Sequence, residues 1–425
     1  MSHRRGSIPA IALLAVLAAG ADAGDDWPQW RGPERDGSLS SPELAEAEWP
    51  AELPRLWRVE VGAGHSSPVV AEGRVFVHSR EGDHEVVTAL SLANGERLWS
   101  DRYPAPFDAN RYAGGHGKGP YATPLVVDGR LFTLGVNATL SAWNAATGEL
   151  VWRLDPTGGA VDSSKLFCGT AGSPILVGDL LVTHVGDDRG GEVLAVGTDT
   201  GEVRWRWRGD GPGYASPVLA ELDGTAQIVT LTDRSVISLD PQDGGLLWRI
   251  DFPDEWNENV VTPLVLGDTL LYSGVRAGTF LVRPRPTAEG FAVETVWRRE
   301  DPAMYLSSPV EIGGRVFGMA KKLKGHLFRL DPASGEVTWR GEGRLGDNAS
   351  LLLAGSTLLV TTTAGEMLVY DTAAEEPMLR ASYELADSAV WAHPAVAGGV
   401  LLLRDAGGLS AWRLPSAPAD PAAGP

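Results

Sequence analysis

The sequence predicts an all-β protein, an eight-bladed β-propeller of four-stranded antiparallel blades that is closed by an N-terminal strand. Two recurring patterns carry this prediction. The first places a Gly seventh and a Trp eleventh in the segments 89–99, 142–152, 195–205, 238–248 and 329–339. The second is a Ser/Thr-Pro pair, or a degenerate form of it, that recurs every 42 to 56 residues before aliphatic residues. Propeller blades repeat about every 40–45 residues, so each interval is interpreted as one blade, with loop insertions in the longer ones.

Each interval has the pattern of a meander of four short strands separated by turns. In the first interval these strands are predicted at 66–70, 74–78, 86–92 and 97–99, with Gly73 and Gly95 in two of the turns. The eight first strands are predicted to begin near Pro68, Pro124, Pro174, Pro217, Pro263, Pro309, Leu351 and Pro394.

The eighth interval has no fourth strand of its own. Its third strand is predicted at 408–412, and a Pro/Ala-rich tail follows Leu414. The segment Leu56-Trp57-Arg58 lies outside any interval and carries a Trp. Pairing the two segments would close the ring and remove the open edges that an unclosed repeat exposes.

The repeated Gly and Trp have separate structural roles. Gly supplies the positive φ of a tight hairpin turn, and the Trp on the outermost strand can cover the gap between neighbouring blades. The fifth blade has Val293 where the Gly would fall, and the seventh has Leu379 in place of Trp, with Tyr383 as a substitute. The predicted docking residues are Trp57, Trp99, Trp152, Trp205, Trp248, Trp297 and Trp339.

The N-terminus has the pattern of a secretory signal peptide over residues 1–23. Arg4 and Arg5 precede an apolar run at 8–20, and Ala21-Asp22-Ala23 is a small-x-small cleavage site. The mature protein is therefore expected to be periplasmic or secreted. It would consist of an irregular N-terminal segment (24–54) packed on the propeller, the propeller (55–414) and a disordered tail (415–425).

Composition excludes several classes of partner. The net charge of −19 gives no electrostatic reason to bind nucleic acid or anionic lipid. No stretch approaches the ~18 apolar residues of a membrane span. Cys168 is the single cysteine and cannot form an intramolecular disulfide. We expect a monomer whose stability comes from packing.

The repeat Ala-x-Asp-x-x-Thr-Gly-x-x-x-Trp resembles the tryptophan-docking repeat of the pyrroloquinoline-quinone (PQQ) propeller superfamily over about residues 27–414. The opening Trp27-Pro28-Gln29-Trp30-Arg31-Gly32-Pro33 is similar to that of many exported PQQ-like bacterial propellers. The resemblance implies either a quinoprotein alcohol dehydrogenase, which binds PQQ and Ca²⁺ over the axis, or a non-enzymatic BamB-like protein.

Departures from both branches narrow this choice. The dehydrogenases carry a vicinal cysteine pair and long insertions, and their quinohaem relatives add Cys-x-x-Cys-His; this chain has only Cys168. BamB proper is lipidated through a cysteine that is absent here. We therefore expect an exported, non-catalytic binding or scaffold module, with no cofactor and no catalytic residue. The alternative is a PQQ-dependent oxidoreductase that uses PQQ with Ca²⁺.

The candidate ligand site is the rim of the axial channel. In this topology the loops that enter each first strand gather on one face around the axis. They would bind an unidentified envelope protein or small ligand, although a solvated rim is the plainer interpretation. The candidate rim residues are His65, His116, Lys118, Tyr121, Lys165, Tyr214, Asn257, Asn259, Tyr305, Asn348 and Trp391.

Other motifs carry less weight. The Gly-rich stretch 114–119 lacks phosphate-loop spacing and a following helix, and is interpreted as a flexible loop. The acidic groups at 83–85 and 187–192 could coordinate a hard cation, but such loop residues are ordinarily solvated. No metal site is predicted.

Overall fold

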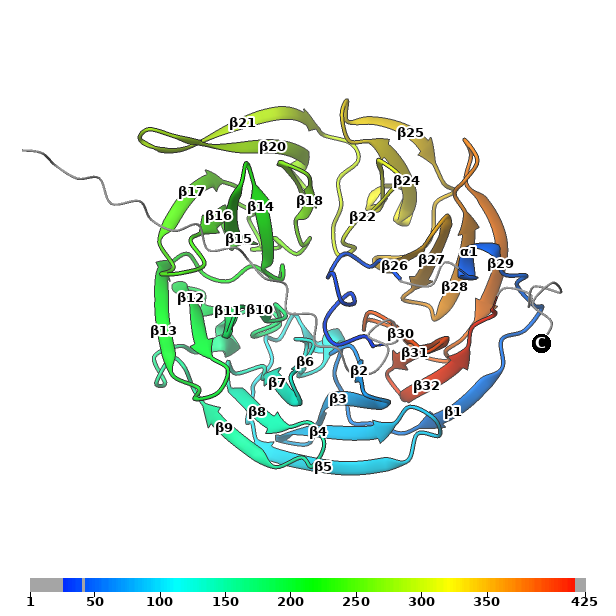
Figure 1. The fold of residues 1–425 in the computed structure, drawn as a ribbon, viewed down its shortest axis with the longest axis horizontal. Coiled ribbons are helices and arrows are strands. Elements are labelled where there is room, and N and C mark those ends of the chain that lie inside the picture. The colour runs from blue at the N-terminus through cyan, green and yellow to red at the C-terminus, as the bar shows by residue number, and fades with distance from the viewer. Residues whose placement is uncertain (1–25, 40–42, 417–425) are drawn as a thin grey trace, which may run out of the picture.

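The computed structural model describes residues 26–39 and 43–416. The predicted signal peptide and most of the predicted tail lie outside these residues. The described chain forms eight four-stranded antiparallel sheets, arranged as the blades of a ring (Figure 1). The predicted eight-bladed β-propeller is thereby confirmed. No helix within the described ranges is long and apolar enough to cross a membrane.

The first four blades follow the chain in order, with the first strand innermost. Their strands are β2 (Val69–Ala71), β3 (Arg74–Glu81), β4 (His84–Ser91) and β5 (Arg97–Pro104); β6 (Leu125–Val127), β7 (Arg130–Leu134), β8 (Leu140–Asn144) and β9 (Leu150–Leu154); β10 (Ile175–Val177), β11 (Leu180–Asp187), β12 (Gly190–Gly197) and β13 (Val203–Gly209); and β14 (Val218–Leu222), β15 (Thr225–Leu231), β16 (Ser235–Leu239) and β17 (Leu246–Asp251).

The next three blades continue this order, and the eighth borrows its outer strand. Their strands are β18 (Leu264–Leu266), β19 (Thr269–Gly274), β20 (Gly278–Thr287) and β21 (Gly290–Arg299); β22 (Val310–Ile312), β23 (Arg315–Ala320), β24 (His326–Asp331) and β25 (Glu336–Arg340); β26 (Ala349–Ala354), β27 (Thr357–Thr362), β28 (Glu366–Asp371) and β29 (Met378–Glu384); and β30 (Ala395–Ala397), β31 (Val400–Asp405), β32 (Gly408–Arg413) and β1 (Arg55–Val59). The short helices are α1 (Glu43–Glu46), η1 (Gly114–His116), η2 (Ser163–Lys165) and η3 (Lys322–Lys324).

The ring is closed by the predicted pairing of the two chain ends. Blue β1 lies beside red β32 in Figure 1, and Val59 pairs with Leu409. Arg404 of β31 makes a second connection between the two ends of the chain. Its guanidinium is buried and donates to four backbone carbonyls of the first blade and the segment that enters it, those of Gly62, Ala63, Ser66 and His78.

The tryptophan repeat joins neighbouring blades at five of the seams in the described chain. The Trp99 indole N–H donates to the Ala145 carbonyl at 2.9 Å, and the ring lies against Gly148 in the turn of the following blade. Trp57, Trp152, Trp205 and Trp297 make the same kind of bond across their seams. The repeated Gly is required here because a side chain would collide with the neighbouring indole.

Two of the seven predicted docking residues behave differently, each facing a blade that departs from the repeat. Trp248 faces the fifth blade, and its indole donates to Gln227 of its own blade at 2.6 Å. Trp339 faces the seventh blade, where its ring meets Tyr370 edge-on at 6.1 Å. Tyr383 is buried, but its hydroxyl donates to the Pro50 carbonyl of the N-terminal segment instead of a neighbouring blade.

Substitutions at two glycines can distinguish how much Trp docking and turn conformation each contribute to the free energy of unfolding. Gly148 (φ 76°) would place a Cβ 2.6 Å from the Trp99 ring, whereas Gly129 (φ 70°) has nothing within 4 Å. Gly129→Ala should cost about 1 kcal/mol in unfolding free energy through left-handed strain alone. Gly148→Ala should cost about 2–4 kcal/mol because strain and overpacking add. Chemical denaturation of the pair measures the difference, and equal losses would contradict tight docking.

The N-terminal segment 26–39 crosses the axis of the ring, dark blue at the centre of Figure 1. Trp27 pairs with Val70 of the first blade, and the N–H of Leu39 donates to Leu353 of the seventh. Between them, Arg31 donates to the Pro309 carbonyl at 2.6 Å and Arg35 to the Pro174 carbonyl at 3.0 Å. The segment therefore plugs one end of the axial channel.

Candidate functional site

A funnel of about 330 Å³ lies on the axis above this plug. Its floor includes Trp30, and its lower wall consists of the hydroxyl residues of the Ser/Thr-Pro pairs. Aromatic and imidazole side chains make up much of the rest of the lining. The lining residues of this kind are Trp30, His65, His116, Tyr121, Phe167, Tyr214, Trp256, Tyr305, Trp391 and His393.

The hydroxyl residues form a relay around the axis. The backbone N–H of Ser67 donates to the Thr123 hydroxyl, that of Thr123 to Ser173, and so on around the ring, with N···O distances of 3.0–3.3 Å. The last hydroxyls of the relay are those of Ser216, Thr262 and Ser308. This relay gives the Ser/Thr of the second to sixth blades a structural role, because each of these five hydroxyls satisfies a backbone donor of the preceding blade.

The rim is an aromatic cluster held by the long loop that enters the second blade. The rings of His116 and Trp391 meet edge-on at 4.9 Å, although they come from opposite ends of the chain. Phe167 lies 5.8 Å from His116, and His65 contacts the Tyr121 and Trp391 rings at 5.7 and 6.1 Å. One His65 ring nitrogen lies 2.9 Å from the His116 carbonyl, which fixes the loop over the funnel.

The structure brings most of the eleven candidate rim residues together. Those that line the funnel are His65, His116, Tyr121, Tyr214, Tyr305, Asn348 and Trp391. Four others lie outside the lining. Lys118 and Lys165 sit on the loops beside Asp108 and Asp162. Asn257 occupies a turn with φ 57°, and the Asn259 amide is buried and donates to two backbone carbonyls. The ligand-binding role of the set stays a prediction.

At the entry to the fifth blade, the residues that line the funnel are the neighbours of the predicted Asn257 and Asn259. Trp256 and Glu258 line the funnel, and the turn at Asn257 sends the intervening residues elsewhere. Glu258 is the one carboxylate that the described residues contribute to the lining, and it accepts from the Tyr305 hydroxyl at 2.7 Å and from Arg276 at 3.1 Å. Its charge is therefore already compensated. Trp30 and His393 were also missed, since neither belongs to the repeat's loop positions.

The field inside the funnel is set by buried guanidinium groups. Burial lowers the pKa of Arg31 to about 10 and, with the help of Arg31, that of Arg35 to about 9, so both remain charged at neutral pH. Burial and the charge of Arg31 lower the pKa of His393 to about 3. Burial and the charge of Arg404 lower the pKa of His65 to about 4. Both histidines are neutral at pH 7.

Cys168 and the acidic loop groups have ordinary structural surroundings. Cys168 lines the funnel half-buried, and burial raises the pKa of its thiol to about 11, so the reactive thiolate is disfavoured. Asp187 pairs with Arg189, and Glu192 with Arg206 and Arg208. Glu85 is buried against Tyr103 and His78 in the first blade. Within the described residues, no three His, Cys, Asp or Glu side chains are grouped as metal ligands would be.

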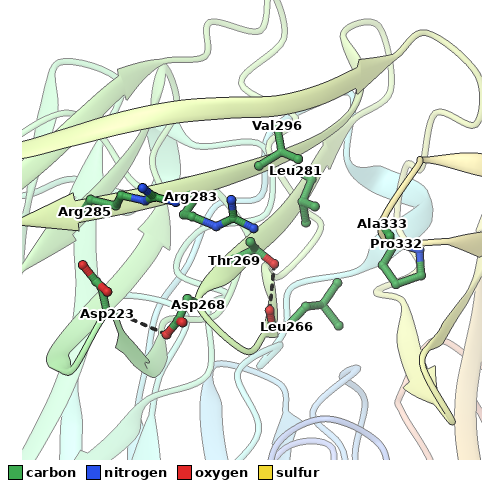
Figure 2. A pocket seen from close by; sticks show the side chains of 10 residues that line it. All are labelled: Asp223, Leu266, Asp268, Thr269, Leu281, Arg283, Arg285, Val296, Pro332 and Ala333. Atoms are coloured by element: carbon green, nitrogen blue, oxygen red, sulfur yellow. Dashed lines mark hydrogen bonds between the residues drawn. The ribbon is translucent and has the colours of Figure 1, made fainter.

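A second hollow of about 610 Å³ lies on the outer side of the fifth blade (Figure 2). Arg283 and Arg285 reach over it from β20, while Asp223 and Asp268 lie on the opposite side. Neither arginine has an ion-pair partner in the part of the chain that the structure describes. The hollow mixes both signs of charge, and it has none of the funnel's aromatic lining.

Comparison with known proteins places the chain in a family. The family described as "Outer membrane protein assembly factor BamB" matches residues 55–114 and 83–341, which together exceed half of the chain. The chain belongs to this family of PQQ-like β-propellers, as the repeat predicted.

Individual relatives match shorter stretches and include both proposed branches. BamB of Salmonella typhimurium is 27% identical over 145 residues, which cover 33% of this chain and 31% of that protein. A polyvinylalcohol dehydrogenase of Sphingopyxis sp. is 25% identical over 174 residues, 40% of this chain and 22% of that protein. The aligned stretches therefore span about a third of these relatives or less.

Solved structures agree on the fold alone. BamB from Moraxella catarrhalis matches with a TM-score of 0.62 at 15% identity, covering 85% of this chain and all of that one. A quinohemoprotein alcohol dehydrogenase from Comamonas testosteroni matches with a TM-score of 0.66 at 16% identity, covering 94% and 82%. The chain is thus a BamB-like and quinoprotein-dehydrogenase-like propeller.

The donor set of the funnel does not fit PQQ with Ca²⁺. Calcium takes six to eight oxygen ligands, usually with carboxylates among them. The lining offers Glu258, whose oxygens are held by Tyr305 and Arg276. Cys168 has no neighbouring cysteine with which to form the vicinal pair. We therefore derive no reaction step through a quinone.

Proposed function

We propose that this chain is an exported, non-catalytic binding protein that captures an envelope protein segment or a small ligand in its axial funnel. The observation that supports this most directly is the construction of the funnel itself. An aromatic rim, a hydroxyl wall and a plugged floor form a concave, mostly neutral site with a few convergent polar groups, which is the usual anatomy of a ligand pocket. The family membership and the signal-peptide pattern support a location of the protein in the periplasm or outside the cell.

The oxidoreductase alternative is supported by the dehydrogenases among the relatives and structural neighbours. Reconstitution with PQQ and Ca²⁺ separates it from the proposal. We expect no quinone absorbance to co-elute with the protein and no dye-linked oxidation of alcohols. Stoichiometric retention of PQQ, or alcohol oxidation that depends on it, would overturn the non-catalytic assignment.

The binding role has its own positive test. Native mass spectrometry of the protein with a library of small acids, amines, sugars and short peptides should detect a ligand that Trp391→Ala or His116→Ala loses. Arg283→Ala with Arg285→Ala, in the outer hollow of Figure 2, is the matched control and should leave that ligand bound. A ligand lost only from the control would move the site away from the funnel.

A further inference from the structure

We propose that the funnel binds an organic anion, with its carboxylate or similar oxyanion inside the hydroxyl ring above Trp30 and its flat apolar part among the rim aromatics. This inference rests on the proposed function and names the chemical class of its ligand. It begins with the direction of the hydrogen bonds around the ring.

Five hydroxyls of the ring each accept one hydrogen bond and keep a free proton. Those of Thr123, Ser173, Ser216, Thr262 and Ser308 each accept a backbone N–H of the preceding blade. Among the described residues, none of these hydroxyl protons has an acceptor within hydrogen-bonding distance. All five line the funnel, and the first four are almost completely buried. A hydroxyl held in this way still has its proton to donate, so the ring offers five donors to a ligand that accepts hydrogen bonds.

The Ser67 hydroxyl is a sixth donor, and unlike the other five it takes no part in a bond between the described blades. Its backbone N–H starts the relay, but no N–H of a neighbouring blade donates to its oxygen in the described chain. The side chain lines the funnel and is 3% exposed. Removing this hydroxyl would therefore delete a funnel group without breaking a bond between blades.

The charges beneath the ring have the sign that favours an anion. The guanidinium carbons of Arg31 and Arg35 lie 5.4 and 5.7 Å from the centre of the Trp30 ring, which forms part of the floor. Both groups donate to carbonyls at the entries to first strands, and the charge of Asp36 acts on Arg31. Their Nε atoms are buried and lack a partner among the described residues. Two buried positive charges, against which the described residues set the single carboxylate of Asp36, leave a positive potential inside a low-dielectric channel.

That potential reaches the funnel lining. The charge of Arg31 disfavours protonation of His393, and the charge of Arg404 disfavours protonation of His65. The same field would stabilise an anion at the same place. A cation would meet it unfavourably, because Glu258 is already paired with Arg276.

The rim suits an aromatic or similarly flat body. Trp391, His116 and Phe167 line the mouth and meet edge-on at 4.9 and 5.8 Å, and aromatic rings of this kind pack favourably against a flat apolar ligand. The source could be a free aromatic acid or the C-terminus of a peptide that ends in an aromatic residue. Both present the same carboxylate and ring.

Three probes with one ring and different charge test the inference. Calorimetry at pH 7 should show that indole-3-acetate binds roughly tenfold or more tightly than its neutral amide, indole-3-acetamide, and more tightly than the cation tryptamine. Raising the ionic strength should weaken the acetate only slightly, since the ring is buried. The tripeptide Gly-Gly-Trp and its C-terminal amide form the second arm. Tighter binding of the free-acid tripeptide than of indole-3-acetate assigns the site to a peptide terminus, and the reverse assigns it to a free acid.

Ser67→Ala is the decisive variant. It should lower the affinity for indole-3-acetate roughly tenfold and that for the amide by clearly less, because a hydrogen bond to a charged acceptor is stronger than one to a neutral carbonyl. The double variant Arg283→Ala with Arg285→Ala removes two positive charges far from the funnel and should change neither affinity. Circular dichroism confirms that each variant is folded.

The outcomes separate this inference from the proposed function. Equal binding of all three probes that Trp391→Ala abolishes would overturn the anion inference and leave ligand capture in the funnel intact. Failure of every probe to bind would overturn the anion inference as well, while the library and the PQQ reconstitution judge the proposed function independently.

Discussion

Replacing Arg404 by Met is expected to lower the free energy of unfolding by about 4 kcal/mol, since buried carbonyls left without a donor cost about 1–3 kcal/mol each. The guanidinium donates at 2.7–3.0 Å to four carbonyls in the segment 62–78, and it does so from β31, at the other end of the chain. Methionine preserves most of the volume but none of the bonds. Denaturant unfolding followed by tryptophan fluorescence measures the loss.

The opposing effect is the cost of burying the charge itself, which lowers the pKa of Arg404 to about 10. Met relieves that cost, so the net loss is smaller than the sum of four broken bonds. Arg413→Met is the matched control: this side chain is exposed and makes a single bond of 3.3 Å to the Gly398 carbonyl. It should change stability by less than about 0.5 kcal/mol. An Arg404→Met protein as stable as the parent would show that β1–β32 pairing alone closes the ring.

The repeat was predictable from sequence because each blade makes its own local bonds. The Gly-x-x-x-Trp spacing encodes a turn and an outer strand, and both are properties of fewer than a dozen residues. The closing strand was predictable because the eighth interval lacks a fourth strand, while the N-terminal segment Leu56-Trp57-Arg58 is a strand that belongs to no interval. One departure noted in the sequence, Val293, lies in the fifth blade, which Trp248 faces without docking in the usual way. The other, Leu379, leaves the seventh blade without a docking Trp of its own.

The floor of the funnel was not predictable in the same way. The segment 26–39 has no periodicity, and its position depends on bonds from Arg31 and Arg35 to blades that lie 138 to 278 residues further along the chain. Sequence reasoning expected its aromatic residues to pack on the propeller and could not place Trp30 on the axis. The Ser/Thr of each Ser/Thr-Pro pair was interpreted only as the start of a strand. The hydroxyl accepts a backbone N–H of the preceding blade, and this bond depends on how neighbouring blades pack.

Truncating a docking tryptophan is the second change with a large expected effect. Trp205→Ala should lower the free energy of unfolding by about 3–5 kcal/mol, the usual range for removing a buried tryptophan. The ring is 8% exposed and lies over Gly244, and its N–H donates to the Pro241 carbonyl at 3.1 Å. Without it, the third and fourth blades lose both the packing and the bond that join their outer strands.

Two further variants divide this loss into its causes. Trp205→Phe keeps much of the packing but removes the N–H, so about 1–2 kcal/mol of the loss should remain. Trp256→Ala is the control for tryptophan itself, because this ring is 69% exposed at the funnel mouth and should cost less than about 0.5 kcal/mol. Comparable losses for Trp205→Ala and Trp256→Ala would contradict inter-blade docking as the source of stability. A loss confined to Trp205 ties the repeated tryptophan to the seams between blades, where its spacing in the sequence requires no ligand.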